Sequence, residues 1–419
     1  MTMQTKGIFS KMPRTKNGAP PVLMLAFLIL IGFFTNLQLA CTPVMLPLIS
    51  KSLNLNTAQL GLIWGMSTFG GLFLALPGGL LGDRVGPRWG IFIIAVITAV
   101  SLGLRGFAKD TTSMAVMMFI GGGVIGSLGS LVTKANFTWF PSTRVGSANG
   151  VWYSFACLGM AVGAAVSATV VAVALRGWQN TFFLYAAILI VLALLWLIII
   201  REPQNSKSST RVPFREAFAK STKTRDVWFC VVAVFGIMGL CTGFIGYLPT
   251  YLQNIGWREA TSSLALTIYF MSAAVGGFVL PAISDRIRLR KIFFIIPSFI
   301  FIIVIGLLAV TKSAVQIWIS IPVAGLAFGN LMTMYRLIIA ETKGIGARYA
   351  GTAISIGAGI GGGAGLLFAA VGGKLALTNA VLPFIFGPLL CLVCNIPFIF
   401  TGETGTRNSV AVQDMVIDN

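Results

Sequence analysis

Two basic residues, Lys134 and Arg336, lie inside long apolar stretches of the sequence, where a charged side chain is costly and usually faces a cavity. Each ends a row of residues spaced three or four apart, which places the row on one face of a helix. The rows are Gly123, Ser127, Ser130 and Lys134, and Gly325, Gly329, Met332 and Arg336. Because arginine binds a carboxylate through two parallel hydrogen bonds and lysine adds a mobile point charge, two such cations would bind a small anion.

An alternative remains open, since both cations lie toward the ends of their apolar stretches. Their long side chains could instead extend to lipid phosphates, or pair within a gate. Glu341, five residues after Arg336, is a candidate partner for such a pair.

Several uncharged polar residues also fall inside apolar stretches and are candidates to line a substrate cavity. They are Asn36, Gln38, Tyr153, Thr242, Tyr247 and Asn330. An unpaired buried amide costs free energy, so Asn36 and Gln38 must either hydrogen-bond to a neighbouring helix or contact a substrate, and the sequence does not decide between these. Arg105, near the end of another apolar stretch, is predicted to extend to the membrane surface.

The elements that must position these residues are membrane helices. Of 419 residues, 56% are hydrophobic and 10% are charged, whereas soluble domains carry about 25% charged residues. We expect twelve spans of the length that a bilayer requires. Their approximate bounds are 21–48, 58–81, 89–108, 112–137, 146–175, 180–200, 227–253, 261–283, 291–310, 314–340, 349–373 and 379–401.

The net charge of +19 comes from Lys and Arg in short loops between these spans, and not from one basic face, so nucleic acid is not an expected partner. The basic residues concentrate in the loops on the side of the N-terminus, above all in the polar segment 202–226. Because such loops stay in the cytoplasm, we expect a protein of the cell (plasma or inner) membrane with both termini cytoplasmic.

The chain repeats itself at an offset of 202 residues, which pairs Asp83-Arg84 with Asp285-Arg286 and Lys134 with Arg336. Three regions are predicted: an N-terminal six-helix half (1–201), a cytoplasmic linker (202–226) and a C-terminal six-helix half (227–419). Duplicated six-helix halves are a known transporter plan, with the substrate site between them.

The loop after the second span reads Gly79-Leu-Leu-Gly-Asp83-Arg84-Val-Gly86-Pro-Arg88. Its glycines allow close helix approach and a tight turn. Its carboxylate can pair with the two arginines in one conformation and release them in another, which would make a gate latch. The second-half copy contains Asp285 and Arg286.

This loop resembles the signature loop of the major facilitator superfamily, G-x-x-x-D-R-x-G-R-R/K, with Pro87 at one usually basic position. Trp139-Phe140-Pro141 and Gly177-Trp178-Gln179 are similar to other loops of that family. The resemblance covers essentially the whole chain. It implies an all-α fold of twelve transmembrane helices in two pseudo-symmetric halves, and secondary transport by alternating access. It assigns a gating role to Gly79, Asp83, Arg84, Gly86, Arg88, Asp285 and Arg286, to which we add Glu341.

None of the 11 acidic residues lies in the middle of a predicted span. A buried carboxylate is the usual proton carrier of such proteins, so we expect exchange of anions, or entry of an anion with a cation through one cavity. The favoured substrate is a small organic or inorganic anion such as a carboxylate, in line with a looser similarity to the organic-anion and nitrate branches of the family.

Two other functions remain alternatives: efflux of a drug or lipophilic metabolite, and a non-transporting membrane scaffold. An enzyme is not expected, because the sequence has no histidine, no nucleophile motif with partners and no phosphate-cradling loop. We expect no cofactor and no metal. The expected partners are a small anion and the lipid bilayer, and the expected state is a monomer.

Overall fold

A computed structural model describes residues 20–404 except 141, 202–213, 288, 312 and 380; within its helices, the side chains of 76, 79–84, 137, 142–147, 214, 215, 217, 282, 285, 346–348, 350 and 351 are not described. The described residues form helices and connecting turns. The helices are α1 (Pro21–Leu53), α2 (Thr57–Arg105), α3 (Thr111–Trp139), α4 (Ser142–Val166), α5 (Ala172–Ala174), α6 (Trp178–Ile199), α7 (Phe214–Lys223), α8 (Arg225–Asn254), α9 (Glu259–Ile287), α10 (Lys291–Leu307), α11 (Ala314–Glu341), α12 (Gly346–Thr378) and α13 (Pro383–Asn395).

These helices make the twelve passes that the sequence predicts. In the described part of the chain, eleven helical segments are long and apolar enough to cross a membrane, and the shorter apolar helix Lys291–Leu307 supplies another. Helix α2 contains two passes joined at Gly86, whose φ of 84° turns the chain back. Helix α4, the π-helical segment Ser167–Val171 and α5 together form one pass.

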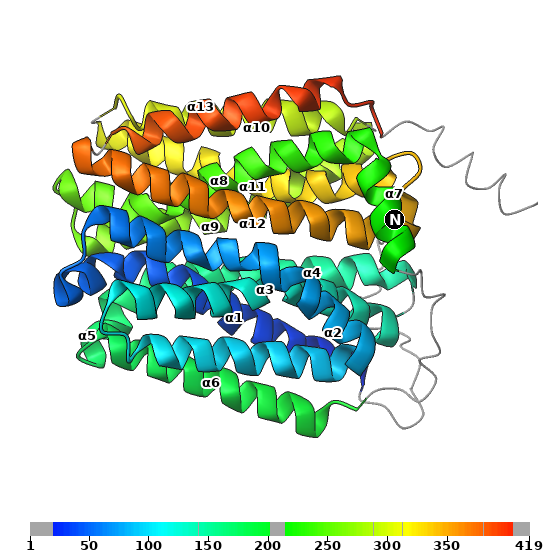
Figure 1. Ribbon diagram of the computed structural model, residues 1–419, viewed down its shortest axis with the longest axis horizontal. Coiled ribbons are helices and arrows are strands. Elements are labelled where there is room, and N and C mark those ends of the chain that lie inside the picture. Colours follow the sequence, from blue (N-terminus) through cyan, green and yellow to red (C-terminus); the bar gives the residue numbers. More distant parts are fainter. Residues whose placement is uncertain are drawn as a thin grey trace, which may run out of the picture.

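The helices form two groups that lie side by side (Figure 1). Helices α1–α6 make one half and α8–α13 the other, and α7 lies across the end at which α6 stops and α8 begins. We call this the linker end, and the opposite end, with the turns at 54–56 and 255–258, the far end. The exact boundaries of the two halves stay a prediction, since 202–213 lie outside the described residues. Large apolar side chains such as Phe278 and Ile198 are exposed on the outside, as a lipid environment requires.

Glycines bring pairs of helices into backbone contact within each half. On α4, a Cβ added to Gly159 or Gly163 would collide with the carbonyl oxygen of Phe33 or Leu37 on α1. In the C-terminal half, the equivalent Gly361 of α12 packs against α8. Since lipid provides no hydrophobic force between helices, such small-residue contacts supply the van der Waals packing that holds them together.

The two rows that end in Lys134 and Arg336 also form helix contacts over most of their length. Gly123 of α3 lies against Gly70 of α2, and Gly325 and Gly329 of α11 lie against the backbone of α9. The glycine members of both rows therefore do not face a cavity, and only the ends of the rows that carry the cations are left to do so.

The two halves meet most closely toward the far end. The indole Nε1 of Trp64 on α2 donates a hydrogen bond to the Thr242 carbonyl on α8, at 2.7 Å. A Cβ at Gly61 of α2 would collide with the Ala369 carbonyl of α12. The hydroxyl of Thr267 on α9 reaches the Ala161 carbonyl of α4, at 3.3 Å. These contacts close the seam between the halves at the far end.

Replacing Gly163 by alanine is expected to destabilise the protein by about 1–3 kcal/mol, because the new methyl group overpacks the α1–α4 contact. Gly150→Ala, on the same helix, has nothing within 4 Å of its new Cβ and should be neutral or slightly stabilising. Thermal unfolding of both variants in detergent measures the difference. Equal stability of the two variants would contradict the packing account.

Candidate functional site

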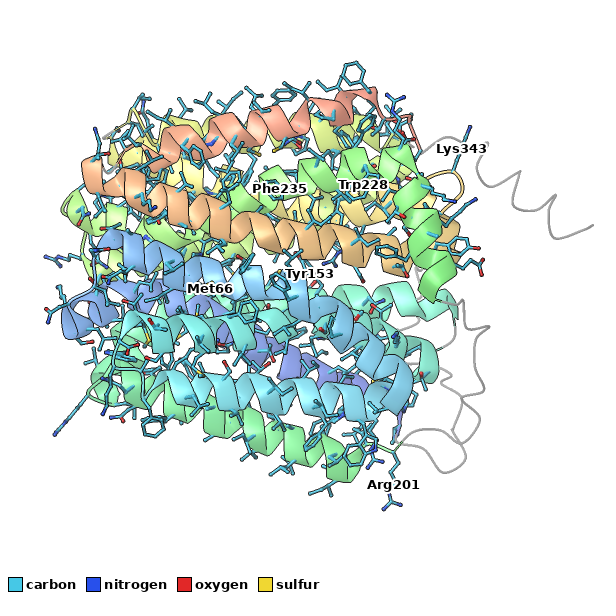
Figure 2. All side chains as sticks on the ribbon, viewed as in Figure 1. Met66, Tyr153, Arg201, Trp228, Phe235 and Lys343 are labelled. Carbon is cyan, nitrogen blue, oxygen red and sulfur yellow. The ribbon has the colours of Figure 1, made fainter. Side chains whose placement is uncertain are left out.

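Arg336 of α11 lies in the seam between the two halves. Its guanidinium carbon is 5.6 Å from the ring centroid of Tyr153, on α4 of the opposite half, and 5.7 Å from that of Tyr335. Its Nε is 3.5 Å from the Tyr335 hydroxyl. Figure 2 shows Tyr153 between the two groups of helices. The Arg336 side chain is nevertheless exposed.

The charge of Arg336 has no carboxylate partner among the described residues. Glu341, one candidate partner, is instead bound to Arg290, which precedes α10: Nη2 lies 2.9 Å from Oε1 and Nε lies 3.1 Å from Oε2. This two-point pairing uses both carboxylate oxygens. Arg336 therefore carries a positive charge in the seam that Glu341 does not neutralise.

Lys134 lies on α3 and is half-buried. Its neighbours in sequence, Thr133 and Asn136, both reach the side chain of Asn149 on α4, at 3.4 and 2.7 Å. Asn149 is one turn before Tyr153, so Lys134 lies near the level of the ring that Arg336 covers. The two predicted cations therefore lie at a similar depth, one in each half.

Aromatic side chains lie around this region, and two of them were not predicted from the sequence. Tyr335 is adjacent to Arg336 in the chain, and neighbouring helical residues normally point about 100° apart, so periodicity does not predict their contact. Tyr269 of α9 is buried, with its hydroxyl 3.3 Å from the Cys241 thiol and its ring stacked on Phe328.

The prediction that Arg105 extends to the membrane surface is wrong. Its side chain is 1% exposed, and its Nη1 donates to the Gln38 amide oxygen at 3.2 Å and to the Thr42 hydroxyl at 3.5 Å. It points into the N-terminal half rather than to the membrane surface. Gln38 therefore has a helix neighbour as its hydrogen-bond partner, which was one of the two options for this amide.

Three other predicted substrate residues donate to backbone carbonyls. Asn36 donates to Gly32 at 2.8 Å within α1, and Asn330 donates to Phe293 of α10 at 2.6 Å. The Tyr247 hydroxyl donates to the Ala369 carbonyl in the far-end seam. The structure thus gives Asn330 and Tyr247 roles in joining helices, and does not place them beside Arg336.

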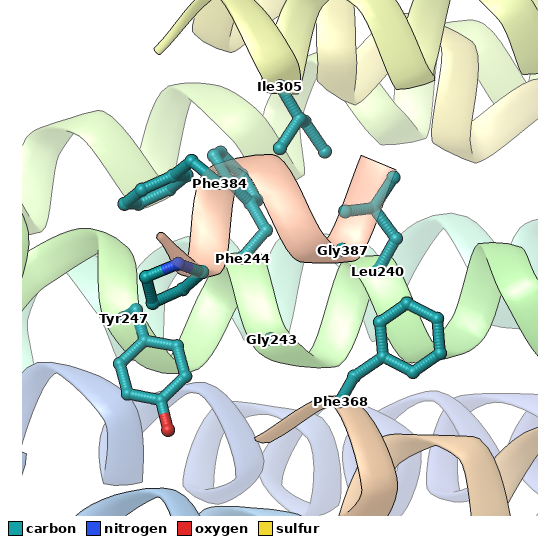
Figure 3. A pocket seen from close by; sticks show the side chains of 9 residues that line it. Leu240, Gly243, Phe244, Tyr247, Ile305, Phe368, Phe384 and Gly387 are labelled. Atoms are coloured by element: carbon teal, nitrogen blue, oxygen red, sulfur yellow. The ribbon is translucent and has the colours of Figure 1, made fainter. Parts of the chain in front are cut away.

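A small apolar hollow lies inside the C-terminal half, between α8, α10, α12 and α13 (Figure 3). Its lining includes Leu240, Phe244, Phe368 and Phe384 and contains no charged residue. The hydroxyl of Tyr247 points away from it, toward the helices of the other half. The hollow is unsuited to an anion. Among the described residues, no group of three His, Cys, Asp or Glu side chains could hold a metal ion.

The predicted gate loop contains the turn at Gly86. Arg88 donates to the Leu197 carbonyl of α6, and the Trp196 indole donates to the Arg88 carbonyl at 2.9 Å, so the loop is anchored within its own half. Arg286 is exposed. The latch itself stays a prediction, because the side chains of Asp83, Arg84 and Asp285 lie outside the described part.

The family model of the Major Facilitator Superfamily matches residues 28–370. The chain belongs to the major facilitator superfamily. Among curated proteins, the probable sulfoacetate transporter SauU of Cupriavidus necator is 25% identical over 64% of this chain and 66% of its own length, just under two thirds. The hexuronate transporter of Bacillus subtilis is 26% identical over 71% of this chain and 75% of its own length. The sialic acid transporter NanX of Escherichia coli is 29% identical over 62% of this chain and 65% of its own length.

Solved structures show the same fold. A bacterial homologue of the human lysosomal transporter Spinster, inward-facing and unoccupied, matches with a TM-score of 0.69 at 16% identity, over 90% of this chain and 92% of that one. A variant of the nucleoside transporter NupG matches with a TM-score of 0.71 at 16% identity, over 90% of this chain and all of that one. The major facilitator fold predicted from the sequence is confirmed, and this member of the family is a multi-pass membrane transporter of small solutes.

In this major facilitator protein, the far-end seam is expected to open if α2 and α12 are forced apart. Gly61→Leu places a side chain against the Ala369 carbonyl, whereas Gly71→Ala on the same helix meets nothing within 4 Å. Each variant carries Thr250→Cys as a far-end reporter. The described native cysteines are all buried, so alkylation by a membrane-impermeant maleimide reports the new thiol. We expect faster alkylation with Gly61→Leu and no change with Gly71→Ala; unchanged alkylation in both would contradict a sealed far end.

Proposed function

We propose that this protein is a secondary transporter of a small organic or inorganic anion, which it moves by alternating access. The observation that carries the proposal is Arg336, an exposed cation in the seam between the halves, held by two aromatic rings and paired with no carboxylate among the described residues. A guanidinium in such a place is a binding group for a carboxylate or oxyanion. Lys134 would add a second positive charge from the opposite half.

The names of the relatives support an anionic substrate. They are described as transporters of sulfoacetate, hexuronate and sialic acid. These solutes differ in size and shape but share a negative charge. A site built on one or two cations accounts for that common feature, and the surrounding side chains would then select the individual substrate.

The closed far end supports alternating access. Contacts at Trp64, Gly61 and Thr267 seal the seam on one side of Arg336, while Arg336 itself remains exposed. The basic loops gather at the linker end, which the rule for positive loops assigns to the cytoplasm. We therefore propose that the protein lies in the plasma membrane with this site open to the cytoplasm.

The placement of the acids supports anion exchange, or joint entry of an anion and a cation. Every described carboxylate lies at or near a helix end, outside the middle of a span; these are Asp110, Glu216, Asp226, Glu259, Glu341 and Glu403. Glu341, the nearest in sequence to Arg336, is bound to Arg290. A buried acid that could carry a proton beside the substrate is not present in the described part of the chain.

The aromatic residues near Arg336 favour a second candidate, efflux of a lipophilic metabolite. The partly exposed ring of Tyr153 would offer such a substrate an apolar contact. Such a substrate would not depend on the charge of Arg336. Removing the charge of Arg336 should therefore impair anion transport and leave efflux of a lipophilic metabolite largely unchanged.

We expect Arg336→Ala to reduce anion flux into proteoliposomes by roughly 10- to 100-fold, because it removes charge-assisted hydrogen bonds of about 1.5–3 kcal/mol. Lys134→Ala should reduce flux as well. Arg258→Ala, which removes the same charge from an exposed far-end turn, is the matched control and should transport normally. Wild-type anion flux in a well-folded Arg336→Ala protein would refute the anion site.

Anion flux is expected to proceed without stoichiometric proton uptake, because the described acids lie away from the middle of the spans. A pH-sensitive dye inside the proteoliposomes, read during flux of a labelled anion, measures this directly. Proton uptake that follows flux in the wild type and disappears in Glu341→Gln would overturn the exchange mechanism.

A further inference from the structure

Arg105 forms a second buried cationic site, separate from Arg336. Its guanidinium leaves the far end of α2, passes Gly121 of α3 so closely that a Cβ there would contact Nη2, and reaches Gln38 and Thr42 on α1. Arg105, Gln38 and Thr42 are at most 1% exposed. The site is therefore enclosed within the N-terminal half and does not open into the seam.

Hydrogen-bond donors at this site outnumber the acceptors. Arg105 has five N–H donors, and Nη1 supplies its two hydrogen bonds, both of them long. Among the described residues, its buried Nε has no acceptor, and neither does the buried Nε2 of Gln38. In the same part of the chain, the buried Thr35 hydroxyl, three residues before Gln38 on the same face of α1, also has no partner.

The positive charge is uncompensated as well. Among the described residues, no carboxylate pairs with Arg105, and Asp110, the nearest acid in sequence, is exposed and caps α3 through Ser113. A buried ion without a counter-charge costs several kcal/mol, and each buried donor without an acceptor adds to that cost. A group that accepts hydrogen bonds and carries one negative charge would remove both costs at once.

We propose that a single small inorganic anion of the chloride type binds beside Arg105, where it accepts hydrogen bonds from Arg105 Nε, Gln38 Nε2 and the Thr35 hydroxyl. The enclosure of the site excludes organic carboxylates and favours a compact, monovalent ion. The anion holds α1, α2 and α3 together as a structural counter-ion. This site does not depend on the proposed substrate site, so either can fail without the other.

The test is thermal unfolding of the purified protein in chloride or bromide, against gluconate at the same ionic strength. Because an ion that binds the folded state stabilises it in proportion to the logarithm of its concentration above Kd, we expect the melting temperature to rise with each tenfold increase of halide. In a crystal grown with bromide, anomalous scattering should place the ion within hydrogen-bonding distance of Arg105 and Gln38.

Gln38→Glu sharpens the test, because it supplies the missing negative charge from the protein itself. We expect this variant to melt higher than wild type in gluconate and to lose its halide dependence. Gln59→Glu adds the same charge at the exposed start of α2, where it keeps the helix cap, and should retain the wild-type response. Thr35→Val removes one donor and should weaken the response.

Two results would overturn the proposal. A wild-type melting temperature that is the same in halide and gluconate would show that water, and not an anion, fills the site. A halide shift that persists unchanged in Gln38→Glu would place the responsible ion elsewhere. Both readouts measure ion binding without any transport assay, so they stand apart from the test of the substrate site.

Discussion

The close approach of helix backbones at glycines is the constraint on which the structure depends. In lipid, apolar side chains gain nothing by leaving the solvent, so helices associate where small residues let their backbones touch. Gly163 brings α4 against α1, and Gly329 brings α11 against α9. These contacts pack the helices of each half tightly together. Gly61 brings α2 against α12 and closes the far end between the halves. The same kind of contact thus builds the rigid bodies and the seam along which they would move.

The role of a charged residue inside the membrane depends on whether it lies in the seam between the halves or within one half. Arg336 lies between the halves, remains exposed, and contacts the rings of Tyr153 and Tyr335. Arg105 lies where helices of one half are packed together, and its donors exceed the acceptors around it. The arrangement at Arg336 suits a substrate anion that binds and is released, and the arrangement at Arg105 suits an anion that stays bound as part of the structure.

The sequence predicted the fold because the length of the apolar stretches, the charge of the loops and the internal repeat can all be recognised without knowing how the helices pack. It also pointed to Arg336, since a charge within an apolar span stands out. It did not predict the environment of Arg105, because the reach of a long side chain depends on how neighbouring helices pack. For the same reason it offered Glu341 as a partner for Arg336, whereas the turn before α10 brings Arg290 to that carboxylate.

The central claim is that the space beside Arg336 binds a small anion. It is tested most directly by thermal unfolding of the detergent-solubilised protein with a panel of carboxylates and oxyanions, and with lipophilic cations as the contrasting set. A ligand that binds the folded state at 100 times its Kd adds about 2.7 kcal/mol of stability. We predict stabilisation by one chemical group of anions, lost in Arg336→Ala. Stabilisation by lipophilic cations, with no response to any anion, would contradict the claim.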